Sequence, residues 1–254
     1  MPPLVLPHDS YGTGDHHVLV LHGWFGDRTS FRDITPHLDT ASFTYVIPDS
    51  RGYGEAIGIP GDFSTDEVAG DALAVADQLG WESFSVAGHS MGGKTAQRLL
   101  TLAPDRVRKI VGISPVPANG AGFDADTAKF FADAPTNPEV RRAIIDQTTG
   151  QRLPAKWLGS MVQHSLDNSS VPAFAAYLPN WSTEDFHTEI DGNPVPALAI
   201  VGRYDPALSA DTMKATWMRS FPNAELCVLE EAGHYAPHET PLALVAAMEK
   251  FLLA

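Results

Sequence analysis

Residues 88–95 read Gly-His-Ser-Met-Gly-Gly-Lys-Thr, and this stretch fits two patterns that belong to different chemistries. As G-x-S-x-G, it is a sharp strand-to-helix turn that presents Ser90 as a nucleophile. As G-x-x-x-x-G-K-[ST], it is a P-loop in which Lys94 and Thr95 would contact phosphate and magnesium. Both patterns need a strand before the turn and a helix after it, so the rest of the chain must decide between them.

Short apolar runs alternate with helical patterns along most of the chain. A capping box at residues 64–67 opens one helix, and the other predicted helices cover 90–102, 209–220 and 240–253. The predicted strands are apolar on both faces, as in a parallel sheet covered by helices on both sides. They cover residues 17–22, 44–48, 84–87, 109–113, 197–201 and 226–229. This order predicts an α/β protein with a mostly parallel, doubly wound sheet.

Residues 118–196 interrupt this alternation because no buried strand is apparent in them. The segment is too long for a simple connection. We interpret it as a mainly helical cap inserted into a core formed by residues 1–117 and 197–254. Packing within the cap is the simpler role for its aromatic side chains, and the alternative is that some line an apolar substrate pocket. Trp24 and Phe25, which follow the first predicted strand, are also candidates for this pocket. The full set of pocket candidates is Trp24, Phe25, Phe123, Phe130, Phe131, Trp157, Tyr177 and Trp181.

The P-loop interpretation finds little support outside residues 88–95. A P-loop usually follows the first strand and needs an acidic residue at the end of a second strand to hold magnesium. Here the turn follows the third predicted strand, and the next strand ends in Ile113-Ser114-Pro115 without an acid. Asp205 follows a later strand but is separated from it by Gly202 to Tyr204.

The nucleophile interpretation finds its partners in three other loops. A serine hydroxyl needs a histidine base and a carboxylate that orients the base, in the chain order serine, acid, histidine. Asp205 and His234 each follow a predicted strand, and the carboxyl ends of parallel strands meet at one edge of a sheet. Asp124 is an alternative acid, because it is the first carboxylate after the strand 109–113. The backbone N–H of Met91 is one candidate oxyanion donor, and a second is expected from the loop 22–26 that follows the first predicted strand.

Five stretches now resemble the α/β-hydrolase superfamily in order and spacing: LHGWFGD (21–27), PDSRGYG (48–54), GHSMGG (88–93), VGRYDP (201–206) and GHYAPHETP (233–241). Within it, HGW followed by GHSMGG resembles small bacterial serine esterases grouped with cofactor-free haloperoxidases. The resemblance implies a Ser90–Asp205–His234 triad and an oxyanion hole from the amides of Trp24 and Met91. It also implies that residues 49–54 brace the elbow, that Lys94 is an ordinary helix residue, and that neither a metal nor an organic cofactor is needed.

The expected activity is hydrolysis of small to medium carboxylic esters through an acyl-enzyme on Ser90. Three other reactions are alternatives for the same triad: hydrolysis of lactones (including acyl-homoserine lactones), of thioesters and of C–C bonds. A further alternative within the fold is a cofactor-independent dioxygenase of the quinolone type. A P-loop nucleotide binder and an inactive binding protein are remote alternatives.

Charge and composition limit the classes of binding partner and the cellular location that we expect. The 254 residues carry a formal net charge of −14, which disfavours nucleic acid and anionic membranes. The single cysteine excludes an internal disulfide, and no apolar run approaches the roughly 20 residues of a membrane helix, so we expect a cytoplasmic location. The oligomeric state is not predicted.

Four other side chains carry expectations. We expect His22 to hold the loop with Trp24 through hydrogen bonds and His89 to pack beside the elbow. Pro237 lies between His234 and His238 and argues against a shared metal site on a helix. Arg141 and Arg142 are expected on a solvated helix face.

Overall fold

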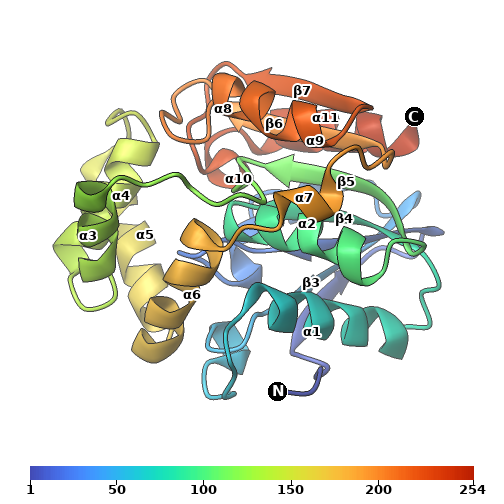
Figure 1. Cartoon of the computed structure of the whole chain (residues 1–254), viewed down its shortest axis with the longest axis horizontal. Helices are drawn as coiled ribbons and strands as arrows, with labels where there is room; N and C mark the ends of the chain where they lie inside the picture. The colour runs from blue at the N-terminus through green and yellow to red at the C-terminus, as the bar shows by residue number, and fades with distance from the viewer.

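A computed structural model describes all 254 residues, and a seven-stranded sheet in the order β1-β3-β2-β4-β5-β6-β7 forms its centre (Figure 1). All six predicted strands are confirmed, with ends that differ from the prediction by at most two residues. They are β2 (His16–Leu21), β3 (Phe43–Pro48), β4 (Phe84–His89), β5 (Val107–Ile113), β6 (Ala197–Gly202) and β7 (Ala224–Leu229), and they pair in parallel. The mostly parallel sheet that the alternation of strands and helices predicts is therefore confirmed.

The first strand, β1 (His8–Tyr11), was not predicted. It pairs antiparallel with β3 at the edge of the sheet, from His8 opposite Pro48 to Tyr11 opposite Tyr45. Its side chains are polar or only partly buried, so the apolar pattern that marks the central strands is missing. An edge strand needs only one neighbour, and β1 pairs with β3 alone.

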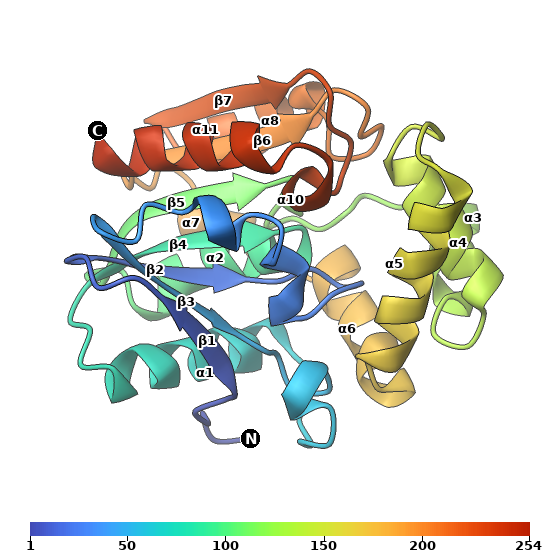
Figure 2. The ribbon, with the colours of Figure 1, turned by 180° about the vertical axis from the view of Figure 1, so that it is seen from behind.

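The sheet separates two apolar layers. Leu19 and Leu21 point into one layer, whereas Val18 and Val20 point into the other, as the alternation of a strand requires. Helices α1 (Thr65–Gln78) and α2 (Met91–Leu102) cover the first face, and α11 (Pro241–Leu253) covers the second (Figures 1 and 2). This double cover explains why β4 and β6 are buried at every position.

The predicted helices form with two local differences. Ser64 caps α1 by accepting from the Glu67 N–H at 3.1 Å, but the Glu67 carboxylate accepts from the Phe63 N–H and not from that of Ser64. The capping box is therefore only half formed. The helix predicted over 209–220 is broken at Thr216 (φ −124°, ψ −84°) into α8 (Ala210–Ala215) and α9 (Trp217–Ser220).

Between β5 and β6 the chain forms five helices and no strand, as predicted. They are α3 (Ala125–Asp133), α4 (Pro138–Thr148), α5 (Ala155–Asp167), α6 (Val171–Thr183) and α7 (His187–Ile190). Helices α3 to α6, here called the cap helices, lie beyond the carboxyl ends of the central strands, whereas α7 packs on α2 (Figures 1 and 2). The division into a core (1–117 and 197–254) and an inserted cap (118–196) stays a prediction. None of the helices is long and apolar enough to cross a membrane.

One expectation about basic residues is wrong. Arg141 is not on a solvated face: it is fully buried, and its guanidinium lies 3.7 Å from the centre of the Phe174 ring. It donates to the carbonyls of Ala134 and Pro135 at the end of α3. Lys94 is a residue of α2, as expected, and it is also fully buried.

Candidate active site

Ser90 occupies a strained turn between β4 and α2. Its φ of 54° and ψ of −114° lie outside the regions that non-glycine residues favour. Main-chain bonds on both sides hold this geometry. The Ser90 N–H donates to the Ile113 carbonyl at 3.0 Å, and the Ser90 carbonyl accepts from Val116 N–H at 3.0 Å. The turn is thus locked to the end of β5, and it places Ser90 at the carboxyl edge of the sheet.

Gly88 and Gly92 are needed for space around this turn. A Cβ on Gly88 would collide with the Gly92 carbonyl, and one on Gly92 would collide with the Leu21 carbonyl. Neither glycine has a positive φ, so close approach of main chain decides both positions. The two glycines of the G-x-S-x-G pattern are therefore positions where a side chain would collide with main chain.

Asp205 and His234 form a buried pair in the loops that follow β6 and β7. His234 Nδ1 lies 2.7 Å from Asp205 Oδ2, and Asp205 is 1% exposed. The other carboxylate oxygen, Oδ1, accepts from the N–H groups of Ala207 and Leu208, both at 3.0 Å. Because the carboxylate is fixed by its own loop, the His234 ring is held with a proton on Nδ1, which leaves Nε2 free to accept one.

Asp124, the alternative acid, does not take part in this pair. It is exposed and caps α3 by accepting from the Thr127 N–H at 2.8 Å. A helix cap explains its position without a further role.

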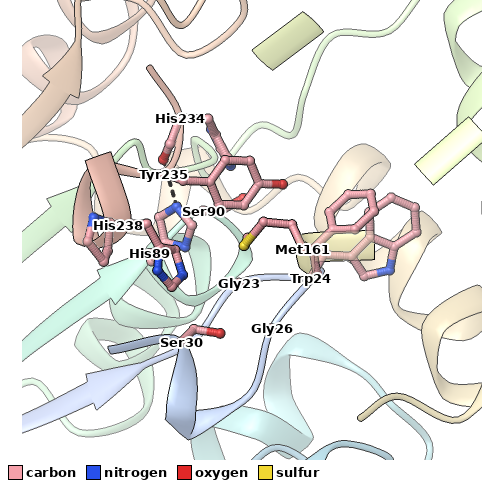
Figure 3. Close-up of a pocket in the computed structure, with 12 residues that line it drawn as sticks. Gly23, Trp24, Gly26, Ser30, His89, Ser90, Met161, His234, Tyr235 and His238 are labelled. Atoms are coloured by element: carbon pink, nitrogen blue, oxygen red, sulfur yellow. Dashed lines mark hydrogen bonds between the residues drawn. The ribbon is translucent and has the colours of Figure 1, made fainter. Parts of the chain in front are cut away.

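The main chain of His234 is held from two sides. The His89 ring lies beside the elbow, as expected, and its Nε2 donates to the His234 carbonyl at 2.8 Å (Figure 3). Burial lowers the pKa of His89 well below its ordinary value, so this ring stays neutral. On the other side, the His234 N–H donates to the Thr148 carbonyl at the end of α4 at 3.0 Å. A cap helix therefore contributes to the position of His234.

The loop that carries Trp24 is braced by residues 49–54. The Ser50 N–H donates to His22 Nε2 at 2.9 Å, so His22 carries its proton on Nδ1 and donates it to the Gly23 carbonyl. The Tyr53 hydroxyl donates to the Trp24 carbonyl at 2.9 Å. Residues 49–54 thus brace the Trp24 loop rather than the elbow itself, and His22 holds this loop as expected.

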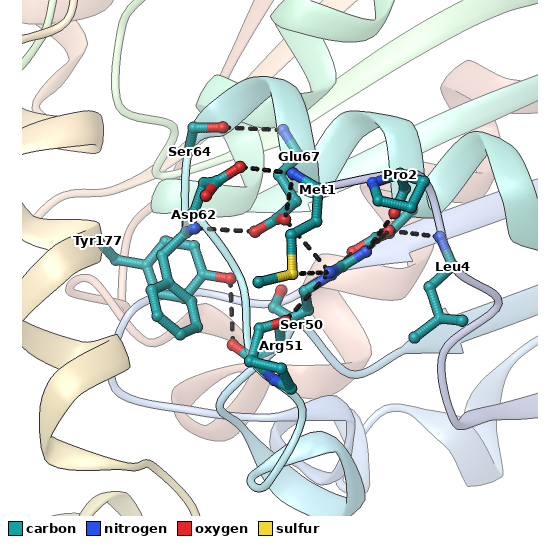
Figure 4. Close-up of polar contacts among 12 residues, drawn as sticks. Met1, Pro2, Leu4, Ser50, Arg51, Asp62, Ser64, Glu67 and Tyr177 are labelled. Carbon is teal, nitrogen blue, oxygen red and sulfur yellow. Dashed lines mark hydrogen bonds and ion pairs between the residues drawn. The ribbon is translucent and has the colours of Figure 1, made fainter.

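This brace is anchored in turn by Arg51. Its guanidinium forms two bonds with Asp71 on α1, at 2.7 and 2.8 Å, and its carbonyl accepts from the Tyr177 hydroxyl on α6 at 3.1 Å (Figure 4). The loop is therefore tied both to a core helix and to a cap helix.

Two cavities meet at Ser90. They share Trp24, Phe25, Ser90, His234 and Tyr235. The smaller cavity, of about 370 Å³, is lined further by residues that include Ser30, His89, Met161 and His238 (Figure 3). The apolar cavity, of about 530 Å³, extends beneath the cap helices and is lined further by residues that include Val116, Phe123, Phe131, Ile144, Trp181 and Leu208. No lysine or arginine lines either cavity.

Five of the eight pocket candidates line the apolar cavity: Trp24, Phe25, Phe123, Phe131 and Trp181. The other three do not line either cavity. Tyr177 packs against Tyr53 and Phe63 on the side of Arg51. Trp157 lies behind the lining, with its ring 5.9 Å from that of Tyr235, and Phe130 packs against Phe131. Aromatic character alone does not separate a lining ring from one in the layer behind it.

Several lining residues were not predicted. Tyr235 directly follows His234, and Leu208 lies three residues after Asp205, so proximity along the chain was a usable signal. Met161 and Ile144 carry no such signal, because their positions depend on how α4 and α5 pack.

Lys94 and Thr95 do not form a phosphate site. Lys94 Nζ donates to the main-chain carbonyls of Trp181 and Glu184, and Thr95 Oγ1 donates to the Met91 carbonyl. Neither residue lines either of the two cavities at Ser90. The His238 ring is bonded to Asp33 at 2.8 Å, and no group of three or more histidine, cysteine or acidic residues is arranged to hold a metal ion.

Comparison with known proteins identifies the family of this chain. The family model for the α/β-hydrolase fold matches residues 16–241. The chain belongs to the α/β-hydrolase family. A putative esterase/lipase of Haemophilus influenzae is 25% identical over 92% of this α/β hydrolase and 82% of the relative. The pimeloyl-[acyl-carrier protein] methyl ester esterase of Klebsiella pneumoniae is 29% identical over 88% of each chain.

Solved structures support the fold. The bromoperoxidase of Bacillus anthracis superposes with a TM-score of 0.85 over 97% of this chain and 95% of its own, at 19% identity. The predicted resemblance to small esterases and haloperoxidase-like hydrolases is confirmed, and this α/β hydrolase is an enzyme of the hydrolase type.

Proposed function

We propose that this α/β hydrolase cleaves small to medium carboxylic esters through an acyl-enzyme formed on Ser90. The observation that carries the proposal is the buried 2.7 Å bond between Asp205 and His234 beside the cavities that Ser90 also lines. Because Asp205 keeps the proton on Nδ1, the Nε2 lone pair of His234 can remove the proton from Ser90 Oγ.

The reaction then follows from the positions of these groups. Ser90 Oγ attacks the ester carbonyl, and the Trp24 and Met91 N–H groups stabilise the negative oxygen of the tetrahedral intermediate. Met91 suits this role because it is the first residue of α2, whose N–H has no acceptor within the helix. His234 returns its proton to the departing alcohol, and a water molecule repeats the sequence on the acyl-enzyme.

Three features favour a neutral ester. The larger cavity is mostly apolar, neither cavity is lined by lysine or arginine, and two of the most similar relatives are described as esterases. A carboxylate or phosphate on the substrate would enter this space without a cationic partner, which is unfavourable.

The test is turnover of a panel of p-nitrophenyl esters, lactones (including an acyl-homoserine lactone) and thioesters by wild type and by Ser90→Ala. We expect kcat/KM for esters to be the highest of the three classes and to fall at least about 1,000-fold in Ser90→Ala. The exposed Ser160→Ala is the matched control and should retain wild-type turnover. Ester turnover that survives Ser90→Ala, or oxygen uptake on a quinolone by that variant, would contradict the proposal.

A further inference from the structure

Lys94 is a fully buried lysine only four residues after Ser90, and the reaction proposed above makes no use of it. Lysine is almost never fully buried unless its charge is matched. Lys94 forms no salt bridge with a carboxylate; its Nζ donates to the carbonyls of Trp181, at 3.3 Å, and Glu184. It also lies 5.6 Å from the centre of the Phe186 ring. The burial of this charge therefore needs a reason.

Its partners mark the carboxyl end of a cap helix. Helix α6 ends at Thr183, and the last carbonyls of a helix have no partner within it. The last turn of α6 contains no basic residue of its own. Lys94 supplies both the missing donors and the positive charge that a helix carboxyl end favours. The opposite end of α6 is held by the Ser170 N–H, which donates to the Gly52 carbonyl at 2.8 Å.

The anchored segment carries a wall of the apolar cavity. Trp181 lines that cavity together with Ser90, and its ring packs against those of Trp24, at 5.3 Å, and Phe123, at 5.6 Å. Ser90, at the N-cap of α2, lines the cavity directly, and Lys94, in the first turn of the same helix, is bonded to the segment that carries Trp181. A displacement of the end of α6 would change the width of the cavity at the point where it meets Ser90.

We propose that Lys94 is a positioning residue that holds Trp181 at a fixed distance from Ser90 and so determines which apolar groups the cavity accepts. This inference rests on the ester hydrolysis proposed above. Lys94 acts through Trp181 and takes no part in the bond-breaking steps.

The test compares Lys94→Met with Lys109→Met across p-nitrophenyl esters from acetate to octanoate. Lys109 is a matched control, because its Nζ also donates to two carbonyls at a helix end, those of Phe251 and Leu252, and it lies near a phenylalanine ring. Neither cavity includes it or its partners. In Lys94→Met we expect KM for the longer esters to change about tenfold, with KM for acetate and all values of kcat within about threefold of wild type. In Lys109→Met the KM series should match wild type.

A double-mutant cycle shows whether Lys94 acts through Trp181. If it does, Lys94→Met should add less than about twofold to the KM shift already caused by Trp181→Phe. A KM series in Lys94→Met that matches wild type, or effects that multiply in the double mutant, would overturn the inference. Should Lys94→Met not fold, Lys94→Gln, which keeps one donor, carries the same expectation and the same contrary result.

Labelling of Ser90 by a fluorophosphonate separates this inference from the proposed function. If wild-type protein is labelled and active, but Lys94→Met has the same KM series as wild type, only the role of Lys94 is overturned. Wild-type protein that neither reacts nor turns over esters would overturn both.

Discussion

At the scale of single residues, hydrogen bonds that involve main-chain groups hold Ser90, Asp205 and His234 in place. Asp205 is held by two N–H groups of its own loop, and His234 by Thr148 and His89. Ser90 is held by one main-chain bond to Ile113 at the end of β5 and by another to Val116 in the loop that follows. In the proposed triad these contacts fix the three groups before a substrate binds, as preorganisation for a transition state requires.

Asp205→Asn tests the orienting acid. The amide oxygen can keep the bonds from Ala207 and Leu208, but its NH₂ group would favour the His234 tautomer with the proton on Nε2. We expect kcat to fall by about 10³- to 10⁴-fold with little loss of stability, as in other triads with this change. Asp124→Asn is the control for the alternative acid and should keep kcat within about twofold. The reverse ranking of these two variants in ester hydrolysis would assign the acid to Asp124.

The burial of Lys94 predicts that the stability difference between wild type and Lys94→Met depends on pH. Burial lowers the pKa of the Lys94 ammonium from 10.5 to about 8, against an opposing effect of the Glu184 and Asp185 carboxylates. Above pH 8 the unfolded chain binds more protons at this lysine than the folded chain, so the contribution of Lys94 to stability rises with pH. Below pH 8 both states are protonated and this contribution is constant.

The measurement is the free energy of urea unfolding of wild type and Lys94→Met at pH 7 and about pH 9.5. The difference between them, wild type minus variant, should become more favourable to wild type by about 1–2 kcal/mol at the higher pH. Groups common to both proteins cancel in this comparison. A difference that stays constant, or that moves the other way, would show that Lys94 titrates as it does in the unfolded chain.

At the scale of elements, buried basic side chains join helix ends that are distant in the sequence. Arg141, near the start of α4, donates to the carbonyls that follow α3 and to the hydroxyls of Ser165 and Ser169 at the far end of α5. Lys94 does the same between α2 and α6. The cap helices are thus held by hydrogen bonds from buried cations as well as by apolar packing.

Arg141→Met tests this role. The substitution leaves buried carbonyls and hydroxyls without donors, and each such group costs about 1–3 kcal/mol, offset in part because the buried charge is removed. We expect a net loss of about 2–4 kcal/mol in the free energy of unfolding. Arg142→Met, one residue further along the same helix, should cost under about 1 kcal/mol because its only bond is a long, exposed one to the Ala155 carbonyl. Equal losses in the two variants would contradict the account.

The predictable elements are those whose local sequence agrees with their final surroundings. The central strands are apolar on both faces and were found, whereas β1 is polar and depends on its partner β3. The break at Thr216 was missed because the apolar helical pattern continues across it. Asp205 and His234 could be placed because strand ends converge on one edge. The burial of Lys94 and Arg141 could not, because their partners are carbonyls from other helices.

At the scale of the whole molecule, the net charge of −14 affects which substrates reach the site. An anionic ester such as a hemisuccinate approaches against this charge and finds no basic side chain in either cavity. Added salt screens the repulsion.

We therefore expect KM for an anionic ester to fall at least about twofold between low salt and about 0.5 M NaCl, while KM for a neutral ester of the same size stays constant. Steady-state kinetics on the matched pair of esters measures this directly. An anionic ester whose KM rises with salt would indicate a basic binding site.

The central claim, that Ser90 is a nucleophile activated by the Asp205–His234 pair, is tested most directly by covalent labelling. Wild-type protein is treated with a fluorophosphonate, and intact mass and peptide mapping locate the adduct. We predict one phosphonyl group per chain on the Ser90 Oγ of wild type, none on Ser90→Ala, and labelling of Asp205→Asn that is slower by at least about 100-fold. A wild-type protein that hydrolyses esters but carries no adduct on Ser90 would contradict the account.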